Sequence, residues 1–129
     1  MVAMKFWRGV WVGCTHAQLM LPQAYDALET VFEKWKPKVI GHLGDYIDTT
    51  ALRAGADGSR DEGEDIGLDL EAGFDFLNWY FVRKASVKVL TLGNHDIRPE
   101  RFLGHPNAMK RYLAEAMQER AKSTFKRLG

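Results

Sequence analysis

Three short apolar segments, each followed by a loop and then by a helical pattern, are the feature that most constrains the fold of this chain. They span residues 6–13, 38–43 and 87–92, and they are rich in the β-branched and aromatic residues that favour strands. Strands that alternate with helices predict a parallel sheet with right-handed crossovers. We therefore predict an α/β fold, with a layered parallel sheet of order β-α-β-α-β-α, in one domain over residues 1–129.

The segments between and after the predicted strands carry apolar residues at helical spacing. The first stripe covers residues 21–35, and Pro22 suits the first turn of a helix. A second stripe covers residues 66–81, and a weaker third stripe follows Pro106. Residues 49–65 hold three glycines among charged side chains, so we predict a loop there.

Side chains that bind metal ions follow all three predicted strands. In chain order they are Cys14, His16, Asp45, Asp48, Asn94, His95 and Asp96. The carboxyl ends of parallel strands lie at one edge of a sheet, where such folds bind ligands, so these side chains should converge. Carboxylate, imidazole and amide groups suit a divalent metal such as manganese, iron or zinc. The chain has neither a Walker A nor a G-x-G-x-x-G phosphate loop.

The three loops resemble the signature motifs of calcineurin-like metallophosphoesterases. That family carries Asp-x-His, Gly-Asp-x-x-Asp and Gly-Asn-His-Asp/Glu after three successive strands. Here the loops read Cys-Thr-His at 14–16, Gly-Asp-Tyr-Ile-Asp at 44–48 and Gly-Asn-His-Asp at 93–96, so only the first departs from the pattern. The third motif with Arg98 shortly behind it resembles the phage-type branch of the family. The resemblance covers about residues 6–101 and implies the N-terminal half of the family's α/β sandwich.

The resemblance implies a metal-dependent phosphoester hydrolase, either a phosphodiesterase or a phosphatase. In such enzymes a hydroxide activated by two metal ions attacks phosphorus. The carried-over roles make Asp45 the bridge between two ions, with His16 on the first and Asn94 on the second. His95 would donate a proton to the leaving oxygen, and Asp96 would orient His95.

The remaining positions include two departures from the family pattern. Asp48 would steady a ligand or a loop from behind, and Arg98 would pair with a substrate phosphate. Cys14 stands where the family has an Asp. It could be a metal ligand softer than a carboxylate, but we favour a buried thiol at the end of a strand. The later histidine motifs are missing, because the only histidine after the third motif is His105, expected in a surface loop. The second metal site would then be incomplete, and a truncated domain would leave the sheet with an open edge and an uncovered face.

Charge and composition bound the partners. One cysteine and no apolar run of the ~20 residues that a membrane helix needs predict a cytoplasmic protein without a membrane partner. Between Arg98 and Arg127 there are eight bases and three acids. This basic segment could contact a nucleic acid or nucleotide substrate, or it could simply be a solvated helix face. Two alternatives stay open: a catalytically degenerate binding or interaction module, and a homo-oligomer that forms through the open sheet edge.

Overall fold

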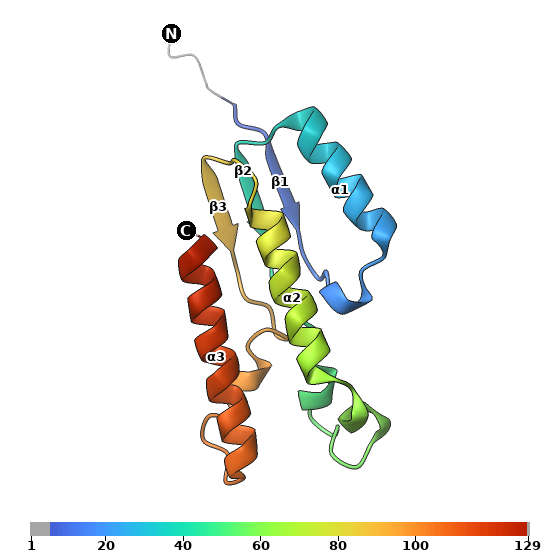
Figure 1. The fold of residues 1–129 in the computed structure, drawn as a ribbon, viewed down its shortest axis with the longest axis vertical. Helices are drawn as coiled ribbons and strands as arrows, with labels where there is room; N and C mark the ends of the chain where they lie inside the picture. The colour runs from blue at the N-terminus through green and yellow to red at the C-terminus, as the bar shows by residue number, and fades with distance from the viewer. Residues whose placement is uncertain (1–5, 129) are drawn as a thin grey trace.

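Residues 6–128 are described by a computed structural model, and they follow the predicted β-α-β-α-β-α order (Figure 1). The strands are β1 (Gly9–Val12), β2 (Val39–His42) and β3 (Val87–Leu90), and the helices are α1 (Pro22–Trp35), α2 (Ile66–Phe81) and α3 (Ala108–Leu128). The strands pair in parallel in the order β1-β2-β3. The predicted fold class is confirmed, and the strands are shorter than predicted because each pairs over four residues only.

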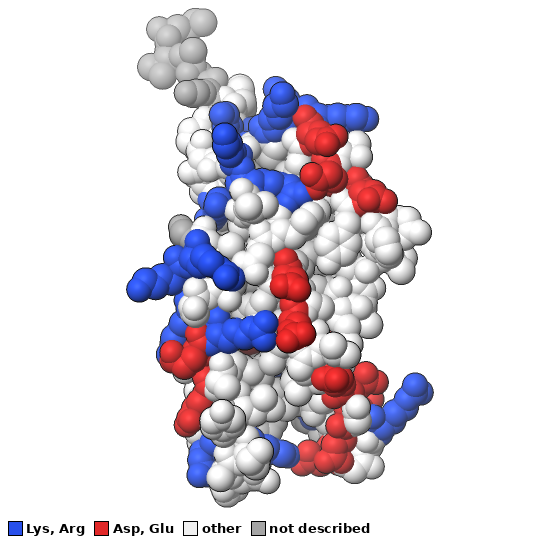
Figure 2. Space-filling view, viewed as in Figure 1, with Lys and Arg blue, Asp and Glu red and all other residues white. Residues whose placement is uncertain are grey.

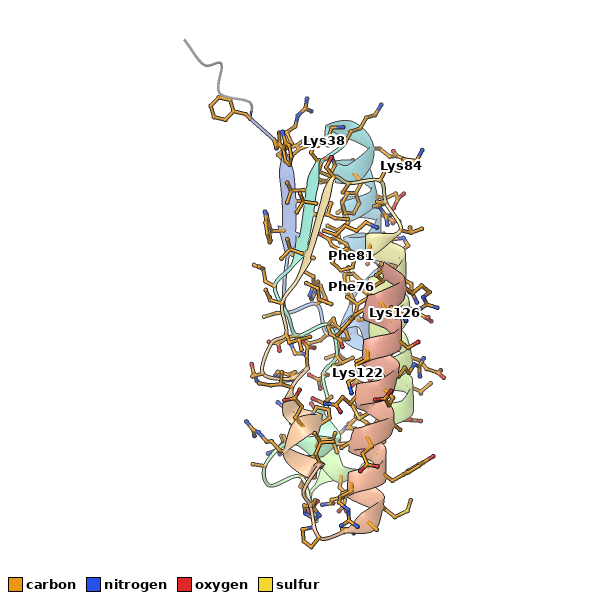
Figure 3. The ribbon with its side chains drawn as sticks, turned by 90° about the vertical axis from the view of Figure 1, so that its left-hand side faces the viewer. Lys38, Phe76, Phe81, Lys84, Lys122 and Lys126 are labelled. Carbon is orange, nitrogen blue, oxygen red and sulfur yellow. The ribbon has the colours of Figure 1, made fainter. Side chains whose placement is uncertain are left out.

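The two faces of the sheet have different surroundings. Figure 3 shows the three helices on one side of the strands, where Phe76 and Phe81 of α2 point toward the sheet. On the other face the Trp11 ring lies across Gly41, where an added Cβ would come within 2.2 Å of a ring carbon. Trp11 is 49% exposed and Leu43 is 56% exposed. The predicted uncovered face is therefore present in the described part of the chain.

Local capping explains where the helices begin and end. Pro22 opens α1, and Lys36 ends it in a left-handed conformation. The carboxylate of Asp65 accepts hydrogen bonds from the second and third residues of α2. Asn107 does the same for α3, so that helix begins after Asn107 rather than at Pro106. The predicted loop of residues 49–65 contains two short 3-10 helices, Thr50–Leu52 and Arg60–Gly63.

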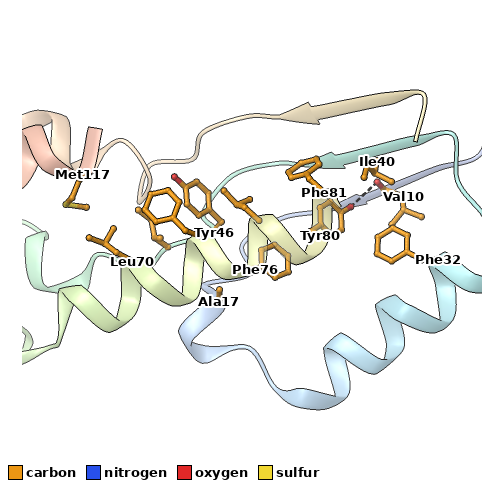
Figure 4. Close-up of a cluster of buried hydrophobic side chains, with 13 residues drawn as sticks. Val10, Ala17, Phe32, Ile40, Tyr46, Leu70, Phe76, Tyr80, Phe81 and Met117 are labelled. Carbon is orange, nitrogen blue, oxygen red and sulfur yellow. Dashed lines mark hydrogen bonds between the residues drawn. The ribbon is translucent and has the colours of Figure 1, made fainter. Parts of the chain in front are cut away.

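The core is centred on the inner face of α2 (Figure 4). The aromatic residues of α2 are all buried or packed against the core, so none of them is left to form a contact surface. The Tyr80 hydroxyl lies 3.2 Å from the carbonyl oxygen of Val10 and 3.0 Å from that of Gly41, so it ties α2 to the backbones of β1 and β2. Burial raises the pKa of Tyr80 to about 12, although the hydrogen bond to Gly41 acts in the opposite direction.

Within residues 6–128, no helix is both long enough and apolar enough to cross a membrane.

Candidate metal centre

The loops that follow the three strands are joined by hydrogen bonds at the carboxyl edge of the sheet. The first loop runs beside the second, because Cys14 N–H donates to Gly44 O and His16 N–H donates to Asp45 O, both at 2.9 Å. The third loop joins them where His95 N–H donates to Asp45 Oδ1 at 2.9 Å. The predicted convergence of the three motifs is thus observed in the backbone.

Two glycines allow the second and third loops to approach this closely. A Cβ on Gly93 would lie 2.1 Å from Asp45 Oδ1, and a Cβ on Gly44 would lie 2.3 Å from Gly93 N. Gly44 also has a φ of +97°, which residues with a side chain rarely adopt. Both positions therefore require glycine.

Left-handed backbone is concentrated in these loops. Among the described residues, five non-glycine residues have a positive φ, and four belong to the site: Cys14 at 50°, His16 at 40°, Asp45 at 57° and Thr49 at 50°. Each such conformation costs about 1–2 kcal/mol for a residue with a Cβ. The hydrogen bonds between the loops offset this strain and hold the ligand side chains at one place.

Three side chains come together as a group that can hold a metal ion. His16, Asp45 and His95 each offer a ligand atom, and these atoms all lie within 4.8 Å of one another. The rings of His16 and His95 meet edge to face, with centroids 4.6 Å apart. His16 Nδ1 is buried and has no hydrogen-bond partner among the described residues. An unpaired imidazole nitrogen beside a carboxylate is a donor set that fits a divalent cation of intermediate hardness.

Asp48 lies against both histidines of this group. Its Oδ1 is 2.7 Å from His16 Nδ1, a close approach without the direction that a hydrogen bond needs, and 3.5 Å from His95 Nδ1. Burial acts to raise the pKa of Asp48, but the Thr50 hydroxyl and the two histidines together bring that pKa below its ordinary value. Asp48 is therefore an ionised carboxylate behind His16 and His95 at neutral pH.

The Asp48–Thr49 backbone is fixed from both sides. The buried carboxylate of Asp69 in α2 accepts from Asp48 N–H at 2.9 Å and from Thr49 N–H at 2.6 Å. Arg98 Nη1 donates to Asp48 O at 3.1 Å and to Thr49 O at 2.8 Å. Arg98 is only 8% exposed and holds this loop, and its pairing with a substrate phosphate stays a prediction.

The role of Asp69 was missed in the sequence, although its spacing carries a signal. Asp69 stands three residues after Ile66, on the apolar stripe of α2, and it is 4% exposed. A carboxylate at a core-facing position needs hydrogen-bond donors. An acid on the apolar face of a helix was therefore the feature that would have identified it.

Asp96 holds the second and third loops together through their backbones. Its Oδ2 accepts from Asp45 N–H at 2.7 Å and from Gly93 N–H at 2.8 Å, and its Oδ1 accepts from Tyr46 N–H at 3.0 Å. Burial raises the pKa of Asp96 above its ordinary value, although these hydrogen bonds act against the rise. The contact expected between Asp96 and the His95 ring is replaced by another one, because His95 Nδ1 hydrogen-bonds the Asp48 carbonyl.

Cys14 and Asn94 lie at the margin of the group. Cys14 is exposed, so the expectation of a buried thiol at the end of a strand is wrong. Its left-handed backbone turns the residue out of the line of β1, and Sγ lies 3.7 Å from Asp45 Oδ2. Asn94 is exposed as well. The structure thus brings His16, Asp45, Asp48 and His95 together and leaves Cys14 and Asn94 beside them.

The fold and this cluster define a class: an α/β protein with a group of histidines and a carboxylate that can hold a metal ion at the carboxyl edge of a parallel sheet. The family model for calcineurin-like phosphoesterases matches residues 10–126, and the chain belongs to that family. This match extends through α3, beyond the stretch that the loop motifs alone cover. Comparisons with curated proteins and with solved structures gave no match.

Proposed function

We propose that this protein hydrolyses phosphoesters with the help of divalent metal. Its family carries out that class of reaction, and the observation that supports it in this chain is the convergence of His16, Asp45 and His95 ligand atoms within 4.8 Å. His16 and Asp45 would hold one ion in this proposal, and the amide oxygen of Asn94, in the loop after β3, would serve a second one. When bound, such ions lower the pKa of water and withdraw charge from the phosphoryl group. Manganese, iron and zinc all suit these donors.

His95 is the proton donor to the leaving oxygen in this proposal. The Asp48 carbonyl oxygen can only accept, so the His95 nitrogen that faces it, Nδ1, carries a hydrogen. Nε2 is then the atom left to act on a substrate, and it has a proton to donate when both ring nitrogens are protonated. Asp48 fixes the orientation of the ring and keeps a hydrogen on Nδ1, and it is therefore a positioning residue.

The test is hydrolysis of an aryl phosphodiester and an aryl phosphomonoester with added manganese, iron or zinc. His95→Ala should lower kcat about 100-fold or more because it removes the proton donor. His105→Ala is the matched control, since the His105 ring accepts from Asn107 N–H at 3.0 Å and packs against Phe102 in the loop before α3. A wild-type protein inactive with all three metals would contradict the proposal and favour a binding module.

Metal affinity separates two roles for His95. A proton donor should leave manganese binding of His95→Ala within about threefold of wild type, whereas loss of a metal ligand should weaken it at least tenfold. His16→Ala provides the comparison, because His16 is assigned only to metal binding.

A nucleic acid or a nucleotide is the substrate that we propose. Exposed cationic side chains gather at one end and along one flank of the molecule (Figures 2 and 3), including Lys38, Lys84, Lys122 and Lys126. Such a flank attracts a phosphate backbone by a salt-dependent interaction. Cleavage of single-stranded DNA should therefore fall steeply between low and high salt, while cleavage of a small aryl phosphodiester should change little. Equal salt dependence for both would contradict this substrate class.

Association of two copies through an open sheet edge is the last part of the proposal. Among the described residues, β1 and β3 each pair with one strand only, and the apolar side chains Trp11 and Leu43 are exposed on the uncovered face. Sedimentation velocity at micromolar concentration should show a dimer, and a monomer there would contradict the association.

A further inference from the structure

His42 makes polar contacts with two of the ligand loops at once. It is the last residue of β2 and is 0% exposed. Its Nε2 lies 3.0 Å from Thr15 Oγ1, and its Nδ1 accepts from Gly44 N–H at 3.1 Å. Thr15 directly precedes His16, and Gly44 directly precedes Asp45. One buried imidazole thus joins the neighbours of two residues of the metal-ligand group.

The two contacts determine the tautomer of His42. A backbone N–H can only donate, so Nδ1 is unprotonated and Nε2 carries the hydrogen that it donates to Thr15 Oγ1. Burial lowers the pKa of His42 to about 4, against the opposing charge of Asp45, so the ring is neutral at physiological pH. Both ring nitrogens are therefore used, and each has a defined role.

Aromatic neighbours prevent the His42 ring from turning away. The rings of Tyr46, Phe76 and Tyr80 meet it edge to face, with centroids at 6.3, 5.4 and 6.3 Å. An apolar side chain would fill such a pocket at a lower desolvation cost than an imidazole. The polar contacts, rather than packing, therefore account for a histidine at this position.

We infer that His42 is a positioning residue of the metal centre, which sets the separation between His16 and Asp45 by holding Thr15 and Gly44. The inference rests on the proposed metal-dependent function. Positioning of this kind acts on metal affinity, because ligands held at the right separation lose less freedom on binding. A residue that serves only to fill the core would change stability and leave the affinity of the folded protein alone.

The experiment compares manganese affinity with the thermal unfolding of the metal-free protein. Thr15→Val removes the hydroxyl that His42 contacts and leaves the imidazole in place. His42→Asn keeps an acceptor near Gly44 N–H but cannot reach Thr15. Thr30→Val is the matched control, because Thr30 Oγ1 donates to Asp26 O within exposed α1.

Thr15→Val and His42→Asn should each weaken manganese binding about tenfold or more, and the double variant should bind no more weakly than His42→Asn alone. Metal-free Thr15→Val should unfold at a lower temperature than Thr30→Val, because the buried His42 Nε2–H loses its acceptor at a cost of about 1–3 kcal/mol, whereas the hydroxyl of Thr30 is exposed. Wild-type affinity in Thr15→Val, or a loss matched by Thr30→Val, would overturn the positioning role.

The outcomes also separate this inference from the proposed function. A wild-type protein that binds manganese without hydrolysing phosphoesters would contradict the proposed function, and the affinities of the variants would still decide the role of His42. Unchanged affinity in Thr15→Val together with normal hydrolysis would overturn the role of His42 alone. A wild-type protein that binds none of manganese, iron and zinc would overturn both.

Discussion

Replacement of Gly93 by Ala tests the closest contact at the metal centre. The new methyl carbon would lie 2.1 Å from Asp45 Oδ1 and 2.7 Å from Asp45 N. Contacts between such atoms stay above about 3 Å in folded proteins, so the carboxylate has to move by about 1 Å. The oxygen that moves is the one that accepts from His95 N–H at 2.9 Å. The substitution therefore separates the second loop from the third.

The cost follows from the two interactions that change. Losing the hydrogen bond from His95 N–H to the Asp45 carboxylate costs about 1.5–3 kcal/mol. Overpacking adds about 1–3 kcal/mol, and the reduced freedom of the unfolded Ala chain returns less than about 1 kcal/mol. The free energy of unfolding of Gly93→Ala should therefore fall by about 2–6 kcal/mol, and manganese binding should weaken at least tenfold.

Urea denaturation of the metal-free protein and a manganese titration measure these two effects. Gly104→Ala is the control, because a Cβ there would meet nothing within 4 Å. Its free energy of unfolding should stay within about 0.5 kcal/mol of wild type. The reasoning is refuted if Gly93→Ala loses less than about 1 kcal/mol and binds manganese as wild type does.

Three further predictions concern residues around the centre. Gly73→Ala should lower the free energy of unfolding by about 1–2 kcal/mol, because its Cβ would lie 2.2 Å from Ile47 Cγ2. Gly67→Ala on the same helix should cost less, because its Cβ would meet only the exposed Asp65 side chain, 3.1 Å away, and Ala has the higher helix propensity. Equal effects in urea denaturation would contradict the close packing of α2. Asp69→Asn should lower the free energy of unfolding by about 2 kcal/mol in the same assay, because an amide places a donor where the N–H groups of Asp48 and Thr49 need acceptors. A change below about 0.5 kcal/mol would argue against that contact. Burial lowers the pKa of folded His42 to about 4, below its ordinary 6.5, so the unfolded state binds the extra proton. The free energy of unfolding should therefore fall as pH drops from about 6.5 toward 4, by about 2 kcal/mol at pH 5. His42→Asn should lack this pH dependence, and equal pH dependence in the two proteins would contradict the assignment to His42.

The elements of the fold were predictable because their signals are local. Apolar spacing and the Gly-Asp and Gly-Asn pairs mark the strands, the helices and the loops between them. The position of Cys14 was not predictable, because a left-handed backbone at a non-glycine residue leaves no pattern in the sequence. Its exposure depends on the hydrogen bond from Cys14 N–H to Gly44 O, which joins two separate loops.

The backbone contacts of Asp96 and Arg98 were not predictable for a related reason. Each holds backbone groups about fifty residues away in the chain, Asp96 at Asp45 and Arg98 at Asp48. Contacts of that separation are set by the tertiary arrangement and not by spacing along the chain. His42 lies between these cases, since it falls within the predicted strand of residues 38–43, whereas its link between two loops required the folded geometry.

The strand order β1-β2-β3 is the same as the order of the chain. A ribosome that releases the chain from its N-terminus therefore delivers each strand to an edge that already exists, and no earlier strand has to open for a later one. His16 and Asp45 can meet while the third loop is still inside the exit tunnel, and His95 arrives last. During synthesis, the full group of three residues is therefore assembled only after the chain has emerged well beyond β3.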